Sequence, residues 1–225
     1  MQQLQRSYIF EFAGMPQSGK TVVKDIFAHY LKRMEYPFEA YHGGSKNSPD
    51  QLYYGPIGEL NQWLAKKTAR FVRSIATDRN TAHKIFLLDR GLIDRCIFTE
   101  ALVQAGKVPE RQAEEIYKSL LFPDLLEKLD GVFIFVSSPE TALIREYHNK
   151  LVKRENVRSE GEVMNESFLS SMRSAAETWN ERVKKDDLVE NVEIIDTEQH
   201  DLGMRATARE VFDIIRHKYP ELGLK

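Results

Sequence analysis

The most constraining feature of the sequence is a glycine-rich loop that directly follows a short apolar run. The run Tyr8-Ile-Phe-Glu-Phe-Ala13 ends at Gly14, which begins the string Gly14-Met-Pro-Gln-Ser-Gly-Lys-Thr21. In this pattern of glycine, four residues, glycine, lysine and threonine, backbone amides wrap around phosphate oxygens, and the next helix points its N-terminus at the anion. The sequence therefore predicts a strand, a phosphate-binding loop and a helix, in that order.

Four further runs have the length and composition of buried strands. They are Phe38 to Tyr41, Lys84 to Leu88, Val132 to Val136 and Val192 to Ile195. Between the runs, apolar residues recur at helical spacing, as at Val22, Val23, Ile26, Phe27, Tyr30 and Leu31. Strands that alternate with helices and are apolar on both faces indicate a parallel sheet with helices on each side. We expect a three-layer α/β domain.

The composition limits the classes of function. With 225 residues, 42% of them hydrophobic, the chain can build one sizeable core, and we expect a single domain over residues 1–225. A formal charge of -2 provides no overall attraction to nucleic acid or to an anionic membrane. The single cysteine, Cys96, excludes an internal disulfide, and the segment from Met1 to Ser7 lacks an apolar signal core. These features predict a cytoplasmic protein.

The loop and the third strand provide the residues for phosphate chemistry. The residues expected to contact the phosphates of ATP are Gly14, Gln17, Ser18, Gly19, Lys20 and Thr21. Thr21 is also a candidate Mg²⁺ ligand, together with Asp89, which follows the third strand at the edge where ligands bind open α/β sheets. Asp89 has a second candidate role, as acceptor of a proton from an attacking hydroxyl, and capping of the next helix is the alternative. Asp94 is expected to be the N-cap of that helix.

From Ile9 to about Lys218 the chain resembles the P-loop nucleoside and nucleotide kinases, most closely the thymidylate kinase group. Specific matches occur at a few segments: Gly14 to Thr21, the pair Asp89-Arg90, Phe135-Val-Ser-Ser-Pro-Glu-Thr-Ala142 with Arg145, Phe168 and Arg173. The resemblance implies a P-loop NTPase fold with five parallel strands in the order 2-3-1-4-5 and a mobile lid. It also implies transfer of the γ-phosphate of ATP to a nucleoside or nucleotide.

The polar segment Lys150 to Asn165 takes the position of the lid in this resemblance. Arg145, Arg154 and Arg158 lie in or just before it, and guanidinium groups suit the charge of a transferring phosphoryl group. A closed lid would exclude water and so prevent hydrolysis of ATP. We assign Arg145 and Arg154 to catalysis and Arg158 to the ATP phosphates. The alternative is a solvated turn whose arginines form surface salt bridges.

The acceptor side is less well defined. Arg70 resembles the arginine that thymidylate kinases place near the acceptor, and Arg90 is the second candidate. Trp63 could stack on a base, although aromatic residues on amphipathic helices more often belong to the core. His42 lies where the family has its loop after the second strand, and a histidine there is more often a turn residue than a catalyst.

Two positions depart from the thymidylate kinase pattern. Pro16 replaces the aspartate that contacts the acceptor sugar in that group, and Gly91 replaces the aromatic residue or histidine that usually follows Asp-Arg. Proline cannot hydrogen-bond a sugar hydroxyl, so the identity of the acceptor stays open.

These observations predict an ATP- and Mg²⁺-dependent phosphotransferase that acts on a small-molecule acceptor. No membrane or nucleic-acid partner is expected, and a homodimer is left open. The alternatives are a P-loop ATPase coupled to a partner and a kinase of another small hydroxyl compound. A regulatory GTPase would need an Asn-Lys-x-Asp string, and the nearest one, Asn149-Lys-Leu-Val152, lacks the aspartate.

Overall fold

Five parallel strands form a single sheet in a computed structural model of the chain. The model describes residue 4 and residues 6–45, 48–77, 83–153, 163–198 and 203–224, with only the backbone described at 76–77 and 150–153. The strands are β1 (Tyr8–Gly14), β2 (Phe38–His42), β3 (Ile85–Asp89), β4 (Gly131–Val136) and β5 (Val192–Asp196). Their order is β2-β3-β1-β4-β5, and every neighbouring pair is parallel. The predicted α/β class and strand order are therefore confirmed.

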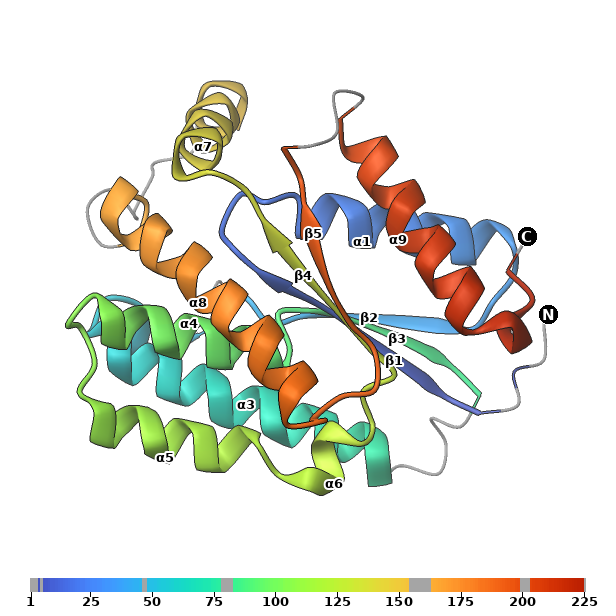
Figure 1. Cartoon of the computed structure of the whole chain (residues 1–225), viewed down its shortest axis with the longest axis horizontal. Coiled ribbons are helices and arrows are strands. Elements are labelled where there is room, and N and C mark those ends of the chain that lie inside the picture. The colour runs from blue at the N-terminus through green and yellow to red at the C-terminus, as the bar shows by residue number, and fades with distance from the viewer. Residues whose placement is uncertain are drawn as a thin grey trace.

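Helices cover both faces of the sheet (Figure 1). One face carries α1 (Lys20–Arg33) and α9 (Met204–Lys218). The other carries α3 (Ile57–Thr77), α4 (Leu92–Gln104), α5 (Glu110–Leu120) and α8 (Glu166–Lys185). The remaining helices are α2 (Asp50–Tyr53), α6 (Pro123–Leu126), α7 (Pro139–Lys153) and η3 (Pro220–Leu222). Helix α2 lies in the connection between β2 and α3.

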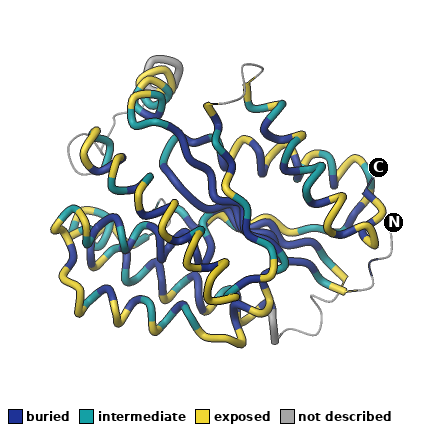
Figure 2. The backbone as a smooth tube through the Cα atoms, viewed as in Figure 1, coloured by how far each residue is buried: buried dark blue, intermediate teal, exposed yellow. Residues whose placement is uncertain are grey.

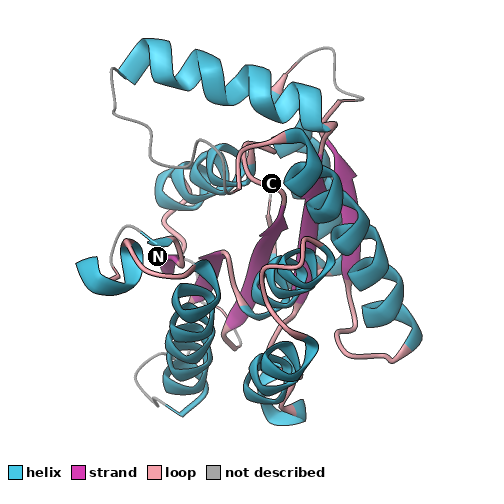
Figure 3. Ribbon diagram, turned by 90° about the vertical axis from the view of Figure 1, so that its left-hand side faces the viewer, coloured by secondary structure: helices cyan, strands magenta, loops and turns pink. Residues whose placement is uncertain are grey.

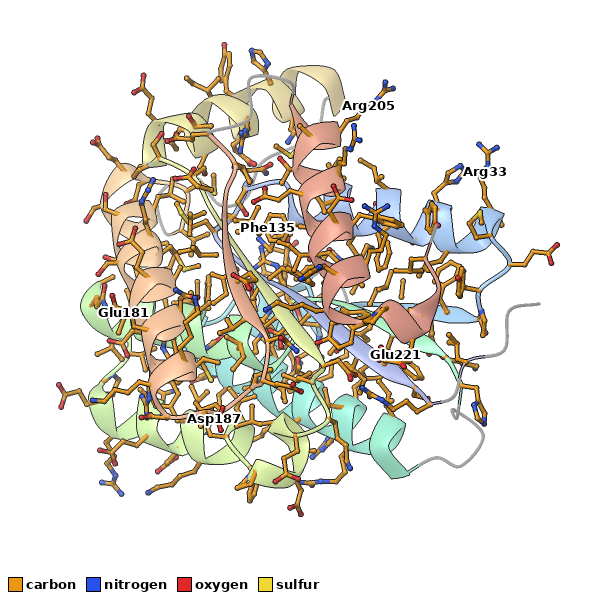
Figure 4. All side chains as sticks on the ribbon, turned by 45° about the vertical axis from the view of Figure 1, so that its right-hand side comes forward. Arg33, Phe135, Glu181, Asp187, Arg205 and Glu221 are labelled. Atoms are coloured by element: carbon orange, nitrogen blue, oxygen red, sulfur yellow. The ribbon has the colours of Figure 1, made fainter. Side chains whose placement is uncertain are left out.

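The core consists of two apolar clusters separated by the sheet. Along β1, alternate side chains point to opposite faces, so Ile9 and Ala13 join one cluster while Phe10 and Phe12 join the other. Figure 2 shows β1, β3 and β4 buried along their whole length, whereas the edge strand β2 and the outer faces of the helices are intermediate or exposed. In Figure 4, Phe135 of β4 lies inside the molecule, whereas side chains such as Arg33 and Glu181 project from its surface.

The carboxyl ends of three neighbouring strands bring the candidate site residues together. Gly14 ends β1, His42 ends β2 and Asp89 ends β3, and His42 and Asp89 are register partners. Because the strands are parallel, these ends lie at one edge of the sheet, which is seen from a second direction in Figure 3. The site is therefore placed by the topology of the sheet.

Candidate active site

The loop between β1 and α1 depends on two glycines. Gly14 has a φ of +113°, and a Cβ atom there would lie 2.2 Å from the backbone oxygen of Phe135. Gly19 has a φ of +90° and immediately precedes α1. Other residues rarely adopt such φ angles, so both glycines are needed for this loop conformation. Within the loop, the buried Ser18 hydroxyl donates to the Met15 oxygen at 2.7 Å.

Lys20 lies folded back onto the loop that precedes it. Its side chain is buried, and Nζ donates to the backbone oxygens of Gly14, at 3.1 Å, and Met15. Burial lowers the pKa of Lys20 to about 7, and the positive charge of Arg90 acts in the same direction, while Asp94 and Asp89 oppose the shift. A phosphate placed beside the ammonium group would stabilise its protonated form, because the negative charge of the phosphate would offset the cost of burial.

Asp89 is the centre of the hydrogen-bonding network at the sheet edge. Its Oδ2 accepts a hydrogen bond from the Thr21 hydroxyl at 2.7 Å and lies 2.8 Å from Nδ1 of His42. Burial would raise the pKa of Asp89, but these hydrogen bonds and the charges of Lys20 and Arg90 outweigh it and hold the pKa well below its usual range. Its Oδ1 is buried and has no hydrogen-bond partner among the described residues. An ionised carboxylate with an unused oxygen beside a hydroxyl suits a hard cation such as Mg²⁺.

Asp94 does not cap the helix, contrary to the prediction. The N-cap of α4 is Gly91, and Asp94 lies in the first turn with its Oδ1 accepting the Gly14 amide at 3.0 Å. Its Oδ2 lies 3.5 Å from Nη1 of Arg90 and 3.5 Å from Nη2 of Arg95. The aspartate therefore joins the phosphate loop to two arginines.

Helix α7 contacts the phosphate loop through Gln17. The Gln17 amide donates to Glu146, and Asn149 donates to Gln17 Oε1 at 2.9 Å. Arg145 donates through Nη1 to Thr197 Oγ1 at 2.9 Å and to the Gln17 oxygen at 3.3 Å, and through Nη2 to the Thr197 oxygen at 3.2 Å. In this structure Arg145 thus connects the loop to the segment that follows β5.

The acceptor-side candidates are more dispersed. His42 lies beside Asp89, and Arg90 lies beside Asp94. Arg70 is exposed and lines a shallow surface groove of α3, α5 and the residue before α6, together with Lys66, Ala69, Arg73, Ser119 and Phe122. Trp63 and Pro16 are both partly buried. The ammonium group of Lys67 lies over the Trp63 ring, 5.1 Å from the ring centre. The structure does not bring Arg70 to the sheet edge.

Two predicted residues, Arg154 and Arg158, lie outside the described residues. Two others escaped the sequence reasoning: Glu11 and Arg95, both fully buried. Glu11 had a signal, because a carboxylate within an apolar strand must find hydrogen-bond donors. Arg95, whose Nη2 donates to the Gly43 oxygen at 3.0 Å, had one too, because it lies among the apolar residues Leu92, Ile93, Cys96 and Ile97.

Known structures share this architecture. A deoxyadenosine kinase from M. mycoides, solved with dCMP and dCDP, superposes with a TM-score of 0.67 over 93% of this chain and 99% of its own, at 15% identity. A thymidylate kinase from Candida albicans gives a TM-score of 0.64 over 96% and 94% of the two chains, at 14% identity. The chain has the fold of the nucleoside and nucleotide kinases. No family model and no curated protein sequence matches the chain.

The described residues contain no cluster of three or more His, Cys, Asp or Glu side chains that could hold a metal ion. Mg²⁺ does not need one, because it is usually bound by one or two protein ligands together with substrate phosphates and water. In the same part of the chain, no helix has the length and apolar character needed to cross a membrane.

Proposed function

We propose that this protein is an ATP- and Mg²⁺-dependent phosphotransferase that transfers the γ-phosphate to a nucleoside or a nucleoside monophosphate. The observation that carries the proposal is the 2.7 Å hydrogen bond between Thr21 and Asp89. Thr21 lies in the first turn of α1 and Asp89 ends β3, and both were assigned to Mg²⁺ on sequence grounds. Their approach, beside the buried Lys20, is the arrangement that a triphosphate-binding site requires.

Each of these residues has a distinct role in the proposal. The amides of the loop and Lys20 would hold the phosphates, while Thr21 and Asp89 would hold Mg²⁺, which neutralises charge on the phosphates when it is bound. The low pKa of Asp89 supports ligation of a cation over proton abstraction, because a base is most effective when its pKa lies near the working pH. Arg90 is the proposed contact for the acceptor.

The solved neighbours support the choice of acceptor class. The M. mycoides enzyme has been solved with dATP as well as with dCMP and dCDP, and the Candida enzyme is a thymidylate kinase. Arg70 and Trp63 stay predictions for acceptor contacts, as do Pro16 and His42. Arg145 and Arg154 remain proposed catalytic residues, and Arg158 a proposed phosphate contact.

A screen of ADP release would test the proposal. The protein would be incubated with ATP and Mg²⁺ alone, and then with each nucleoside, nucleoside monophosphate or other small hydroxyl compound. We expect slow release without an acceptor and a large stimulation by one nucleoside or nucleotide, with the phosphorylated product identified by mass spectrometry. Release that is equally fast without any acceptor would identify an ATPase and contradict the proposal.

A further inference from the structure

Glu11 is a fully buried carboxylate in the middle of the central strand β1. Its Oε1 accepts the amide of Asp94 at 2.7 Å, and its Oε2 accepts the amide of Ile93 at 3.2 Å. These amides belong to the first turn of α4, and the N-cap residue of that helix, Gly91, has no side chain with which to bind them. Glu11 therefore caps α4 from the neighbouring strand, with its carboxyl group at the positive end of the helix dipole.

Gly91 is required for this arrangement because of space. A Cβ atom at residue 91 would lie 2.4 Å from Oε2 and 2.5 Å from Cδ of Glu11, which is closer than non-bonded atoms approach. The carboxylate thus occupies the volume that a side chain at residue 91 would need. The glycine after Asp89-Arg90, which departs from the thymidylate kinase pattern, is explained by Glu11.

The position of the first turn of α4 affects both sides of the candidate active site. Asp94, whose amide Glu11 holds, accepts the Gly14 amide at the start of the phosphate loop. The other carboxylate oxygen of Asp94 faces Arg90, the proposed acceptor contact. A shift of this turn would therefore move the loop and the arginine together.

We propose that Glu11 is a positioning residue: by holding Asp94, it fixes the positions of the phosphate loop and Arg90 relative to each other. This inference rests on the proposed phosphotransferase function. A consequence is that the amides of Ile93 and Asp94 are engaged within the protein and are not available to bind an anionic acceptor group.

A transfer of the cap from one residue to another tests the inference. Glu11→Ala removes the carboxylate and opens the space at residue 91. Gly91→Ser, added to Glu11→Ala, supplies a hydroxyl at the N-cap that can accept a hydrogen bond from the amide of Ile93 or Asp94. Glu11→Gln, which keeps the size but replaces one acceptor with a donor, is a milder variant if Glu11→Ala does not fold.

Asp130 provides the matched control. Its Oδ2 also accepts a backbone amide of β1, that of Ile9 at 2.8 Å, and its side chain is largely buried. It lies beyond the amino end of the sheet, away from the phosphate loop. Asp130→Asn should lower thermal stability without changing the kinetic constants of the folded protein.

The readouts are kcat/KM for the acceptor found in the screen, the Kd of a fluorescent ATP analogue, and hydrogen exchange of the Gly14 amide. We expect Glu11→Ala to lower kcat/KM by about 10- to 100-fold, because a small misplacement of a positioned group costs on this scale. Glu11→Ala should also speed hydrogen exchange of the Gly14 amide. The double variant should recover most of the lost kcat/KM and most of the protection of this amide. Gly91→Ser alone should be as damaging as Glu11→Ala.

Three results would overturn the inference. The first is that kcat/KM, the Kd of the analogue and Gly14 exchange are all unchanged in folded Glu11→Ala or Glu11→Gln. The second is that Gly91→Ser alone keeps the activity of the wild type. The third is that the double variant is no more active than Glu11→Ala. If the wild-type protein phosphorylates no acceptor, the proposed function fails. Gly14 exchange and analogue affinity then still decide whether Glu11 positions the loop.

Discussion

The hydroxyl of Thr21 donates to the carboxylate of Asp89 across 2.7 Å, although the two residues are 68 positions apart in the chain. Thr21 lies in the first turn of α1, and Asp89 ends β3, the immediate neighbour of β1. The pairing places a hydroxyl and an ionised carboxylate beside the loop that would hold a triphosphate. This relationship makes Asp89 the first residue to test.

Asp89→Asn keeps the size of the side chain but removes its charge. We expect kcat to fall by about 100-fold or more, while the affinity for ATP without Mg²⁺ changes little. Steady-state kinetics over a range of Mg²⁺ concentrations would measure the effect. Thr21→Ser, which retains the hydroxyl, is the control and should stay close to wild type. A loss of stability with full activity per folded molecule would show that Asp89 is only structural.

The low pKa of Lys20 predicts that nucleotide binding takes up a proton. The pKa is about 7 in the free protein, and the negative phosphates would raise it. Binding of ADP at about pH 8 should therefore be accompanied by uptake of nearly one proton, and at about pH 6 by much less from this group. Calorimetry in buffers of different ionisation enthalpy measures the proton count. The uptake should vanish in Lys20→Met, and a wild-type protein without it would contradict the assignment.

Local patterns in the sequence predicted the strands and placed Asp89 beside the phosphate loop, because apolar runs mark strands and parallel strands end at one edge. The order of the strands did not follow from these patterns; it was implied by the resemblance to the nucleoside and nucleotide kinases. The contact of Glu11 with Asp94 could not be predicted, because it joins residues 83 positions apart through backbone amides. Arg70 shows another limit: it shares a helix face with Lys66 and Arg73, and only the packing of α3 shows where that face points.

The two arginines assigned to catalysis should differ in their effects. Arg154→Ala should lower kcat by about 100-fold with little change in ATP affinity, if its interaction belongs to the transition state. Arg145→Ala should weaken nucleotide binding as well, because Arg145 connects Gln17 of the phosphate loop to Thr197. Kinetics and direct binding measurements separate the two outcomes. An Arg154→Ala variant with full kcat would favour the alternative that the segment Lys150 to Asn165 is a solvated turn.

Glu11 also predicts how stability depends on pH. Burial is the main cause that raises its pKa to about 7, the negative charge of Asp94 adds to it, and the amides of α4 only partly oppose the shift. Because the unfolded chain has the ordinary pKa of 4.5, the folded state holds the proton more tightly between these two values. The contribution of Glu11 is therefore fully favourable below pH 4.5, declines as the pH rises through 7, and is constant above that.

The expected decline from this group is on the order of 3 kcal/mol, since one pKa unit corresponds to about 1.4 kcal/mol. Urea unfolding between about pH 5 and pH 8 would measure it as a fall in the free energy of unfolding. Glu11→Gln cannot titrate, so its curve should lack this component, and the stability difference between the two proteins should shift in favour of the variant as the pH rises. Parallel curves for wild type and variant would show that Glu11 is ionised throughout the range, and that the amides of α4 fully compensate its burial.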